Sequence, residues 1–200
     1  MIKDKITPEL KNRFLQEIQD TIRDGNEHGL LICSDEKGKL STSNSLKGEQ
    51  HRIFLKSLKD QCKFKIQGEF HTHPHATEAK IYIEEKFGRM VQLEDARKIV
   101  LDIAKKKNVS LTGPSYGDTL GTIMLRYGKD TLGTTCIGTD LEPDKVECWS
   151  TKNSVTEDDF DTATREFFGG NVNGSPLEWV RNLFDKEVIY LKEKDNRKIY

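Results

Sequence analysis

The sequence predicts a mixed α/β protein in which a sheet is flanked by helices. Apolar residues recur at helical spacing over 8–24 and 93–107, a short apolar run lies at 28–33, and residues 64–73 are predicted to be a strand that ends at Pro74. A stripe every three or four residues indicates a helix with one buried face, whereas a short apolar run bounded by turn residues indicates a strand. The pattern therefore favours the α/β class, although it does not give the order of the strands in the sheet.

The first helix is expected from Pro8 to Asp24. Thr7 can cap its amino end, the proline suits its first turn, and Gly25 can end it. Its apolar residues recur at every fourth position and form one face, at Leu10, Phe14, Ile18 and Ile22. We expect the helix to bury this face.

The other predicted elements are shorter and are bounded by glycine, proline or acidic turn residues. Further helices are expected at 49–60, 115–127, 156–168 and 176–185. Further extended segments are expected at 39–43, 131–139, 145–151, 188–191 and 198–200, the last two as a small hairpin.

The charge of the chain argues against a nucleic-acid partner. Its 32 basic and 33 acidic residues give a formal net charge of −1, and the two signs are mixed along the sequence. A phosphate backbone is held by a one-sided basic surface, which this pattern does not indicate. The amino terminus has no apolar signal core, and no segment is long enough to span a bilayer. We therefore expect no nucleic acid and no membrane among its partners.

The cysteines predict reduced thiols and a cytoplasmic protein. The four occur singly, at 33, 62, 136 and 148, without a Cys-x-x-Cys pair. This spacing fits free thiols better than a disulfide framework. The alternative is a bridge between Cys136 and Cys148, which can face each other across a hairpin.

The stretch from Gly68 to Pro74 predicts a metal site. Side chains two residues apart on a strand point to the same face, so His71 and His73 can direct two imidazoles at one ion. A catalytic zinc needs a third protein ligand and an open position for water. Asp118 can be that ligand, because it falls in the first turn of a helix expected to begin near residue 115. Mixed imidazole and carboxylate ligation suits zinc, although the sequence leaves iron and manganese open.

Two further residues can complete a hydrolytic site. Glu27 stands at the mouth of the apolar run at 28–33 and can accept a proton from a water whose pKa the metal lowers. The same carboxyl group can then protonate a leaving amine. Ser115 can donate a hydrogen bond to the oxyanion of a tetrahedral intermediate. The pattern therefore predicts Glu27 as acid and base, and Ser115 as oxyanion donor.

These stretches together resemble the JAMM motif of the MPN-type (JAB domain) zinc metalloproteases. Their order along the chain is that of the family: Glu27-His-Gly-Leu-Leu, Gly68-x-x-His71-x-His73-Pro74 and Pro114-Ser115-x-x-Asp118. The resemblance covers roughly residues 8–150. It implies an α/β fold of the MPN type, which is cytidine-deaminase-like, with a curved mixed sheet flanked by helices.

The resemblance also implies the roles of individual residues. Carried over by position, His71, His73 and Asp118 correspond to the ligands of one zinc ion per chain. Glu27 corresponds to the acid and base, and Ser115 to the oxyanion donor. These are the roles that the residue types and their spacing suggest independently.

Two positions depart from the family pattern. Thr72 stands where the family usually has serine. Residues 75–114 separate two motifs that the family normally places close together, and they include the predicted helix at 93–107. We expect a helical insertion at about 78–110 that acts as a lid or a partner-docking element beside the site.

The resemblance implies a hydrolase that cleaves an amide or isopeptide bond at the carboxyl-terminal tail of ubiquitin, or of a ubiquitin-like or sulfur-carrier protein. Residues 1–150 would form the catalytic domain, and 151–200 a carboxyl-terminal extension packed on it. A small-molecule amide is another substrate for the same fold. The alternative is a non-catalytic MPN-type scaffold that binds partner proteins, but such a member would be expected to lack a ligand that this sequence has. The sequence leaves the oligomeric state open.

Overall fold

The computed structural model describes residues 2–49, 55–107, 111, 113–115, 117–119, 122, 133–168 and 182–192. The strands are β1 (His28–Ser34), β2 (Leu40–Thr42), β3 (Leu46–Lys47), β4 (Lys65–His73), β5 (Thr134–Thr139), β6 (Lys145–Thr151) and β7 (Phe184–Tyr190). The α-helices are α1 (Pro8–Asp24), α2 (His75–Phe87), α3 (Leu93–Lys107) and α5 (Glu157–Phe168), and short 3-10 helices are η1 (Lys3–Lys5) and η2 (Leu55–Gln61). The predicted α/β class is therefore confirmed.

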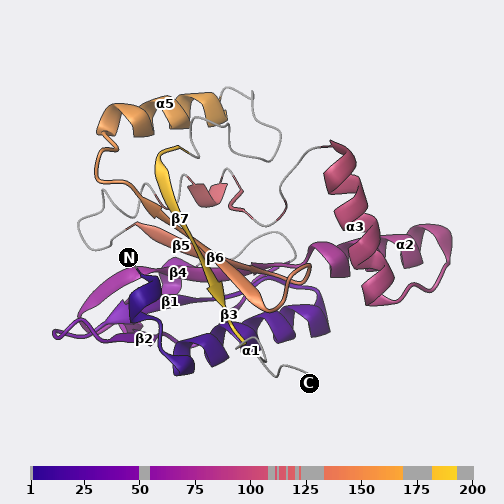
Figure 1. Cartoon of the computed structure of the whole chain (residues 1–200), viewed down its shortest axis with the longest axis horizontal. Coiled ribbons are helices and arrows are strands. Elements are labelled where there is room, and N and C mark those ends of the chain that lie inside the picture. Colours follow the sequence, from indigo (N-terminus) through magenta and orange to yellow (C-terminus); the bar gives the residue numbers. More distant parts are fainter. Residues whose placement is uncertain are drawn as a thin grey trace, which may run out of the picture.

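All the described strands belong to one mixed sheet. Its order is β2-β1-β4-β5-β6-β7, and β3 also pairs with β1. The contact between β4 and β5 is parallel, whereas the other neighbouring strands are antiparallel. In Figure 1, α1 lies along one side of the sheet and α5 stands on the other, while α2 and α3 project beyond the end of the sheet.

Helix α1 covers one face of the sheet, and its predicted boundaries are confirmed. The Thr7 hydroxyl accepts the backbone N–H of Leu10, and Gly25 ends the helix in the left-handed conformation, with φ 72°. Phe14 and Ile18 are fully buried, and the Phe14 ring stacks on Phe70 of β4 at a centroid distance of 4.4 Å. The predicted apolar face is therefore the one that packs on β4.

The opposite face of β1 and β4 carries a second, smaller core. Leu31 of β1 and Ile66 of β4 pack there against Leu55 and Leu58 of η2. A helix is predicted at 49–60, and its later part is the 3-10 helix η2, while residues 50–54 lie outside the described residues. Both faces of the two inner strands are thus covered, which explains why every residue of β1 is buried.

Helix α2 lies largely within the helical insertion expected at about 78–110, but only the second helix of that insertion, at 93–107, is predicted individually. His75 is half-buried and is the first residue of α2. The buried Asp140 carboxylate, from the loop after β5, accepts the backbone N–H groups of Ala76 and Thr77 at 2.9 and 2.7 Å. An acidic group at a helix amino end satisfies free N–H groups and complements the helix dipole. The helix start is therefore fixed by a contact between segments far apart in sequence.

The predictions for the carboxyl-terminal segment are confirmed in one part and wrong in another. The helix expected at 176–185 is wrong where the structure describes it, because Phe184–Tyr190 forms β7 on the outer side of β6. The extended segment expected at 188–191 is confirmed over 188–190, although its described partner is β6. Ile189 lies opposite Val146 and is only 2% exposed. Burial of alternate residues against β6 decides the conformation, and this partner lies about forty residues earlier in the chain. The rest of these predictions falls outside the described residues.

The prediction of free thiols is also wrong, because the four cysteines form two disulfides. Cys33 of β1 is bonded to Cys62, which follows η2, and Cys136 of β5 to Cys148 of β6. The second pair lies directly opposite in the β5–β6 register, as the alternative interpretation of the sequence allowed. Sequence spacing does not reveal the first pair, since its partners meet only after η2 folds back on β1.

None of the described helices is both long and apolar enough to cross a bilayer.

Candidate metal centre

The two histidines of the His-x-His pair lie at the carboxyl end of β4, on the face of the sheet that is turned away from α1. Alternation along the strand directs Phe70 and Thr72 towards α1, where the Phe70 ring meets Phe14. His71 and His73 therefore project from the other face, and both are buried. Their Nε2 atoms lie 3.2 Å apart.

Asp118 reaches the same place from a short helical start beyond the insertion. The backbone N–H of Ser115 donates to an Asp118 carboxylate oxygen at 2.6 Å, and the N–H of Asp118 donates to the Ser115 hydroxyl at 3.2 Å. This reciprocal pair is a capping box, which holds the side chain of the third helical residue against the helix start. A helix is predicted at 115–127; residues 117–119 and 122 are helical, and the remainder lies largely outside the described residues.

The three side chains bring their donor atoms together, with a different Asp118 oxygen nearest to each histidine. The His71 Nε2 atom is 3.2 Å from Asp118 Oδ1, and the His73 Nε2 atom is 3.5 Å from Asp118 Oδ2. These two distances and the 3.2 Å between the imidazole nitrogens are close to the separation of about 3.3 Å expected between ligands of a tetrahedral zinc. With one atom taken from each residue, all three donors lie within 4.8 Å of one another. The cluster can therefore hold a metal ion, and the donor set fits one.

The protonation behaviour of the cluster reflects its dense charge. Burial lowers the pKa of His71, but the neighbouring Asp118 carboxylate outweighs it and, with Glu69 and Glu27, raises that pKa to about 9. Burial likewise raises the pKa of Asp118, yet the two histidines hold it well below its usual range. Without a metal, the centre thus favours a protonated imidazole beside a carboxylate. A divalent cation would take the place of that proton.

Glu27 directly precedes β1, the strand that pairs with the strand of the two histidines. Gly29 pairs with His71 in the antiparallel β1–β4 register, so alternation directs Glu27, two residues earlier, to the same face as the histidines. Glu27 is buried, with 8% of its surface exposed. Its backbone N–H donates to the carbonyl of Glu49 at 3.0 Å, and its carbonyl accepts the N–H of Gly48 at 2.8 Å. These bonds fix the backbone that carries the carboxylate.

Glu69 is a third carboxylate at the site, and the sequence analysis missed it. One of its oxygens lies 3.9 Å from His71 Nδ1 and accepts a hydrogen bond from the Thr135 hydroxyl at 3.2 Å. Burial raises the pKa of Glu69. A carboxylate beside the second ring nitrogen of a histidine ligand is a common way to orient the ring. The strand period that predicts the histidine pair also places Glu69 on that face, and this was the available signal.

Ser115 and His75 differ in how they contact the centre. The half-buried Ser115 hydroxyl accepts the Asp118 N–H, and an acceptor hydroxyl still has its own proton to donate. The His75 ring packs edge-on against His73, with ring centroids 5.4 Å apart. Ser115 thus lies at the cluster through its bonds with Asp118, and His75 borders it without joining the three donors.

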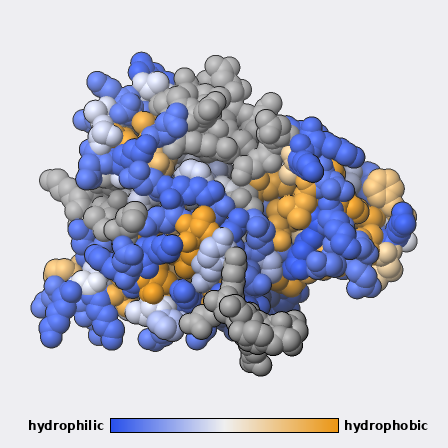
Figure 2. Space-filling view, viewed as in Figure 1, coloured by the Kyte–Doolittle hydropathy of each residue, from blue (hydrophilic) through white to orange (hydrophobic). Residues whose placement is uncertain are grey.

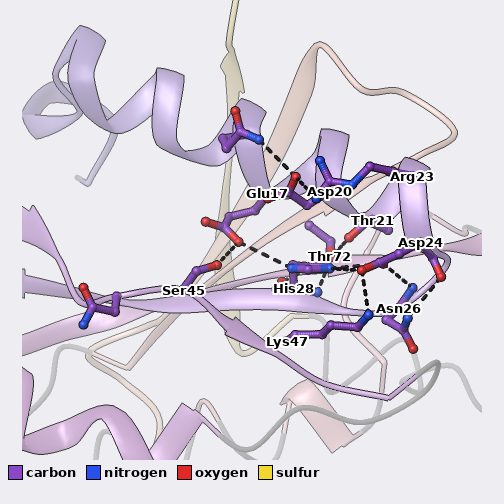
Figure 3. Close-up of polar contacts among 12 residues, drawn as sticks. Glu17, Asp20, Thr21, Arg23, Asp24, Asn26, His28, Ser45, Lys47 and Thr72 are labelled. Carbon is purple, nitrogen blue, oxygen red and sulfur yellow. Dashed lines mark hydrogen bonds and ion pairs between the residues drawn. The ribbon is translucent and has the colours of Figure 1, made fainter.

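A second group of Glu17, Asp20 and His28 on the α1 side could also hold a metal by the proximity of its atoms. Figure 3 shows that these residues belong to a wider polar network between α1, β1 and β3. Arg13 lies 3.5 Å from Glu17, and Arg23 lies 2.7 Å from Asp20. Each of the two carboxylates is therefore already paired with a cation, which accounts for this group without a metal.

The network centres on His28. Its Nε2 atom lies 3.1 Å from both oxygens of Asp24, and Lys47 contacts the same carboxylate at 2.9 Å. On the other side of the ring, Nδ1 is 3.9 Å from Glu17, which also accepts a hydrogen bond from Ser45. His28 is thus clamped between two acids of α1 while its neighbour Glu27 faces the metal centre.

Comparison of the chain with protein-family models, with curated proteins and with solved structures gives no significant match. The function is therefore argued from the geometry and chemistry of the site.

The Asp24 ion pair predicts a pH-dependent contribution to stability. Burial raises the pKa of Asp24, but Lys47, the Asn26 backbone N–H and His28 outweigh it and lower that pKa from 3.8 to about 2. A lowered folded-state pKa stabilises the protein above pH 3.8, and the contribution is lost as the pH falls towards 2. Because the Lys47 side chain is 55% exposed, solvent screens this ion pair, and we expect Asp24→Asn to lower the free energy of unfolding by about 1 kcal/mol at pH 7.

Urea denaturation of the wild type and Asp24→Asn at pH 7, 5 and 3 checks this prediction, and the gap between them should narrow at the lowest pH. Asp144→Asn is a matched control, because Asp144 contacts Lys192 at 2.7 Å on the exposed surface. Exposed ion pairs contribute little, so the control should stay close to wild type. An equal loss for Asp24→Asn at all three pH values would contradict the assignment.

Proposed function

We propose that this protein is a JAMM-type zinc metallopeptidase that hydrolyses an amide or isopeptide bond. The observation that carries the proposal is the buried cluster of His71, His73 and Asp118, whose donor atoms lie close enough together to hold one ion. Three protein ligands leave the fourth position for water, which is the arrangement of catalytic rather than structural zinc. Glu27, directly before the neighbouring strand β1, adds the carboxylate that hydrolysis requires.

The residues of the chain would divide the reaction between them. Zinc, when bound, supplies Lewis acidity that lowers the pKa of water and polarises a carbonyl group. The Glu27 carboxylate accepts a proton from the attacking water and returns it to the leaving amine. The Ser115 hydroxyl donates to the developing oxyanion. Glu69, 3.9 Å from His71 Nδ1, would favour the ring orientation in which Nε2 points to the other two donors.

The substrate class that we propose is the extended carboxyl-terminal tail of a ubiquitin-like or sulfur-carrier protein. A flexible tail can be held by adding to the edge of a sheet through backbone hydrogen bonds. The centre lies at the end of β4, where Pro74 joins the strand to helix α2. The scissile bond of such a tail would then reach the three donors as the tail leaves the sheet.

The α2–α3 hairpin is the proposed docking element for the body of that substrate. It begins directly after His73-Pro74, and Figure 2 shows apolar surface along this projecting part of the molecule. Phe87 is 69% exposed and Met90 83% exposed. The other large apolar side chains exposed on the hairpin are Tyr82, Ile99, Leu101 and Ile103. Clustered exposed apolar residues favour a role in binding another protein.

Metal content is the first test of the proposal. Tag-free wild-type protein supplied with zinc is expected to hold about one zinc per chain, measured by plasma mass spectrometry. His73→Ala removes one of the three proposed ligands, so the variant should lose the metal. His75→Ala is the matched control, since this neighbouring histidine lies outside the three donors. Absence of metal from the wild type would favour the non-catalytic scaffold instead.

Glu27→Gln tests the acid and base. The amide keeps the size of the side chain but cannot accept the proton, so we expect zinc content to stay unchanged while turnover falls by about 10²–10⁴-fold. The assay is release of a fluorogenic amine from the carboxyl terminus of ubiquitin and of a bacterial-type sulfur-carrier protein. Full turnover by the variant would remove Glu27 from the mechanism.

Substitution of Phe87 and Met90 together by serine tests the hairpin. If the hairpin holds the body of the substrate, KM should rise by about tenfold, which corresponds to about 1.4 kcal/mol of lost binding, while kcat and zinc content stay unchanged. Phe64→Ser is the control, because Phe64 is 60% exposed but precedes the opposite end of β4. A KM equal to that of the wild type would show that docking occurs elsewhere.

A further inference from the structure

We propose that Thr72 is a positioning residue whose hydroxyl fixes the place of Glu27 relative to the two histidines. This inference rests on the proposed function, because it concerns the alignment of the acid and base with the metal centre. Thr72 lies between His71 and His73, and it points to the face of the sheet that carries no metal ligand. Its proposed effect on the reaction is therefore transmitted through the backbone.

The backbone ladder between β1 and β4 ends where the site begins. Its last paired residues are Gly29 and His71. One residue further, the link is made by a side chain: the N–H of His28 donates to the Thr72 hydroxyl at 2.8 Å. The same hydroxyl donates its proton back to the carbonyl of His28 at 3.2 Å. One side chain thus satisfies both backbone groups of His28.

The hydroxyl of Thr72 uses its full hydrogen-bonding capacity. A hydroxyl has one proton to donate and can accept two hydrogen bonds. With its proton directed to the His28 carbonyl, it accepts one bond from the His28 N–H and a second from the hydroxyl of Thr21 in α1. Thr21 and Thr72 are both fully buried, so no water is available to replace a lost partner. The arrangement ties three elements, α1, β1 and β4, to one atom (Figure 3).

The hydrogen bonds between Thr72 and His28 matter for the site because each of these two residues is a neighbour in sequence of a proposed functional residue. His28 follows Glu27 directly, and Thr72 is flanked by the two histidines of the centre. The side chain of His28 is held on the α1 side by Asp24, so His28 cannot follow Glu27 freely if the backbone shifts. Removing the hydroxyl would leave the buried backbone groups of His28 without these partners. The strand end that carries Glu27 would then move to satisfy them.

The geometry requires a hydroxyl at position 72 rather than a threonine as such. Serine can make all three bonds, whereas valine has the shape of threonine and makes none of them. This accounts for the one-residue departure from the motif that the chain resembles, where serine is usual. It also supplies the matched pair of variants that separates hydrogen bonding from packing.

The test compares Thr72→Val, Thr72→Ser and the control Thr134→Val in the full-length zinc-loaded protein. Thr134 is a buried threonine at the other end of β5, and its hydroxyl contacts that of Ser150 at 2.8 Å. We expect Thr72→Val to keep one zinc and an unchanged KM but to lose about 10²-fold in kcat, the effect of a misplaced catalytic group. Thr72→Ser and Thr134→Val should stay within about threefold of wild type in kcat, well short of that misplacement loss.

A purely structural role for Thr72 would lower the melting temperature without changing the kcat of the folded enzyme, and that result would overturn the inference. So would loss of zinc from Thr72→Val, or an equal loss of kcat in Thr72→Ser. Hydrogen exchange of the His28 amide supplies a measurement that does not depend on turnover. The amide should be protected in wild type and Thr72→Ser and should exchange faster in Thr72→Val. Equal exchange of the His28 amide in the wild type and both Thr72 variants would refute the inference. This test holds even if the enzyme cleaves none of the assayed substrates and the proposed function itself fails.

Discussion

The antiparallel pairing of β1 with β4 is the constraint on which the rest of the structure depends. It aligns Gly29 with His71 and so brings Glu27, near the amino end of one strand, beside the histidine pair at the carboxyl end of the other. The strands run in opposite directions, so the amino end of β1 and the carboxyl end of β4 lie side by side at the same end of the sheet. A register change of one residue would move every side chain of a strand to the opposite face. The site is therefore specified by the same register that buries the core.

The two faces of β4 differ in chemistry: one packs against α1, and the other carries the ionisable groups of the candidate site. On the α1 face, the Phe70 ring packs on Phe14, and the Thr72 hydroxyl satisfies buried backbone groups. On the other face, His71 and His73 approach each other closely beside a carboxylate. Ionisable groups so close together are costly to bury unless they are paired. The apolar and hydrogen-bonded face offsets this cost by holding the strand in place, as expected of a preorganised site.

Local sequence pattern was sufficient for the elements that carry their own signals. Helix α1 has a capping threonine, a four-residue apolar repeat and a terminal glycine, and its boundaries follow from these alone. The shared face of His71 and His73 follows from strand alternation. Elements defined by distant partners could not be found in this way. The start of α2 depends on Asp140, β7 depends on β6, and the disulfide of Cys33 depends on how η2 folds back.

The candidate site likewise contains residues that a local pattern places and one residue that it does not. Strand period places the two histidines and also Glu69 on one face, but the period alone does not distinguish a carboxylate that orients a ligand from one that only borders the site. The approach of Asp118 to the histidines is different, since 44 residues separate it from His73 and no local pattern measures that distance. The order of the three motifs predicts this approach, and the distances between the donor atoms support a metal at the site.

Asp140 shows how the insertion is joined to the centre. The Asp140 carboxylate caps α2 directly after His73-Pro74, and the Asp140 backbone N–H donates to the His73 carbonyl at 3.4 Å. The Asp140 carbonyl accepts a hydrogen bond from the Arg97 side chain of α3 at 2.5 Å. One buried residue therefore contacts the histidine strand and both helices of the hairpin. A hairpin anchored at its root in this way keeps a fixed distance from the three donors. If a protein substrate docks on its exposed apolar surface, as proposed, this fixed distance would determine which bond of that substrate reaches the three donors.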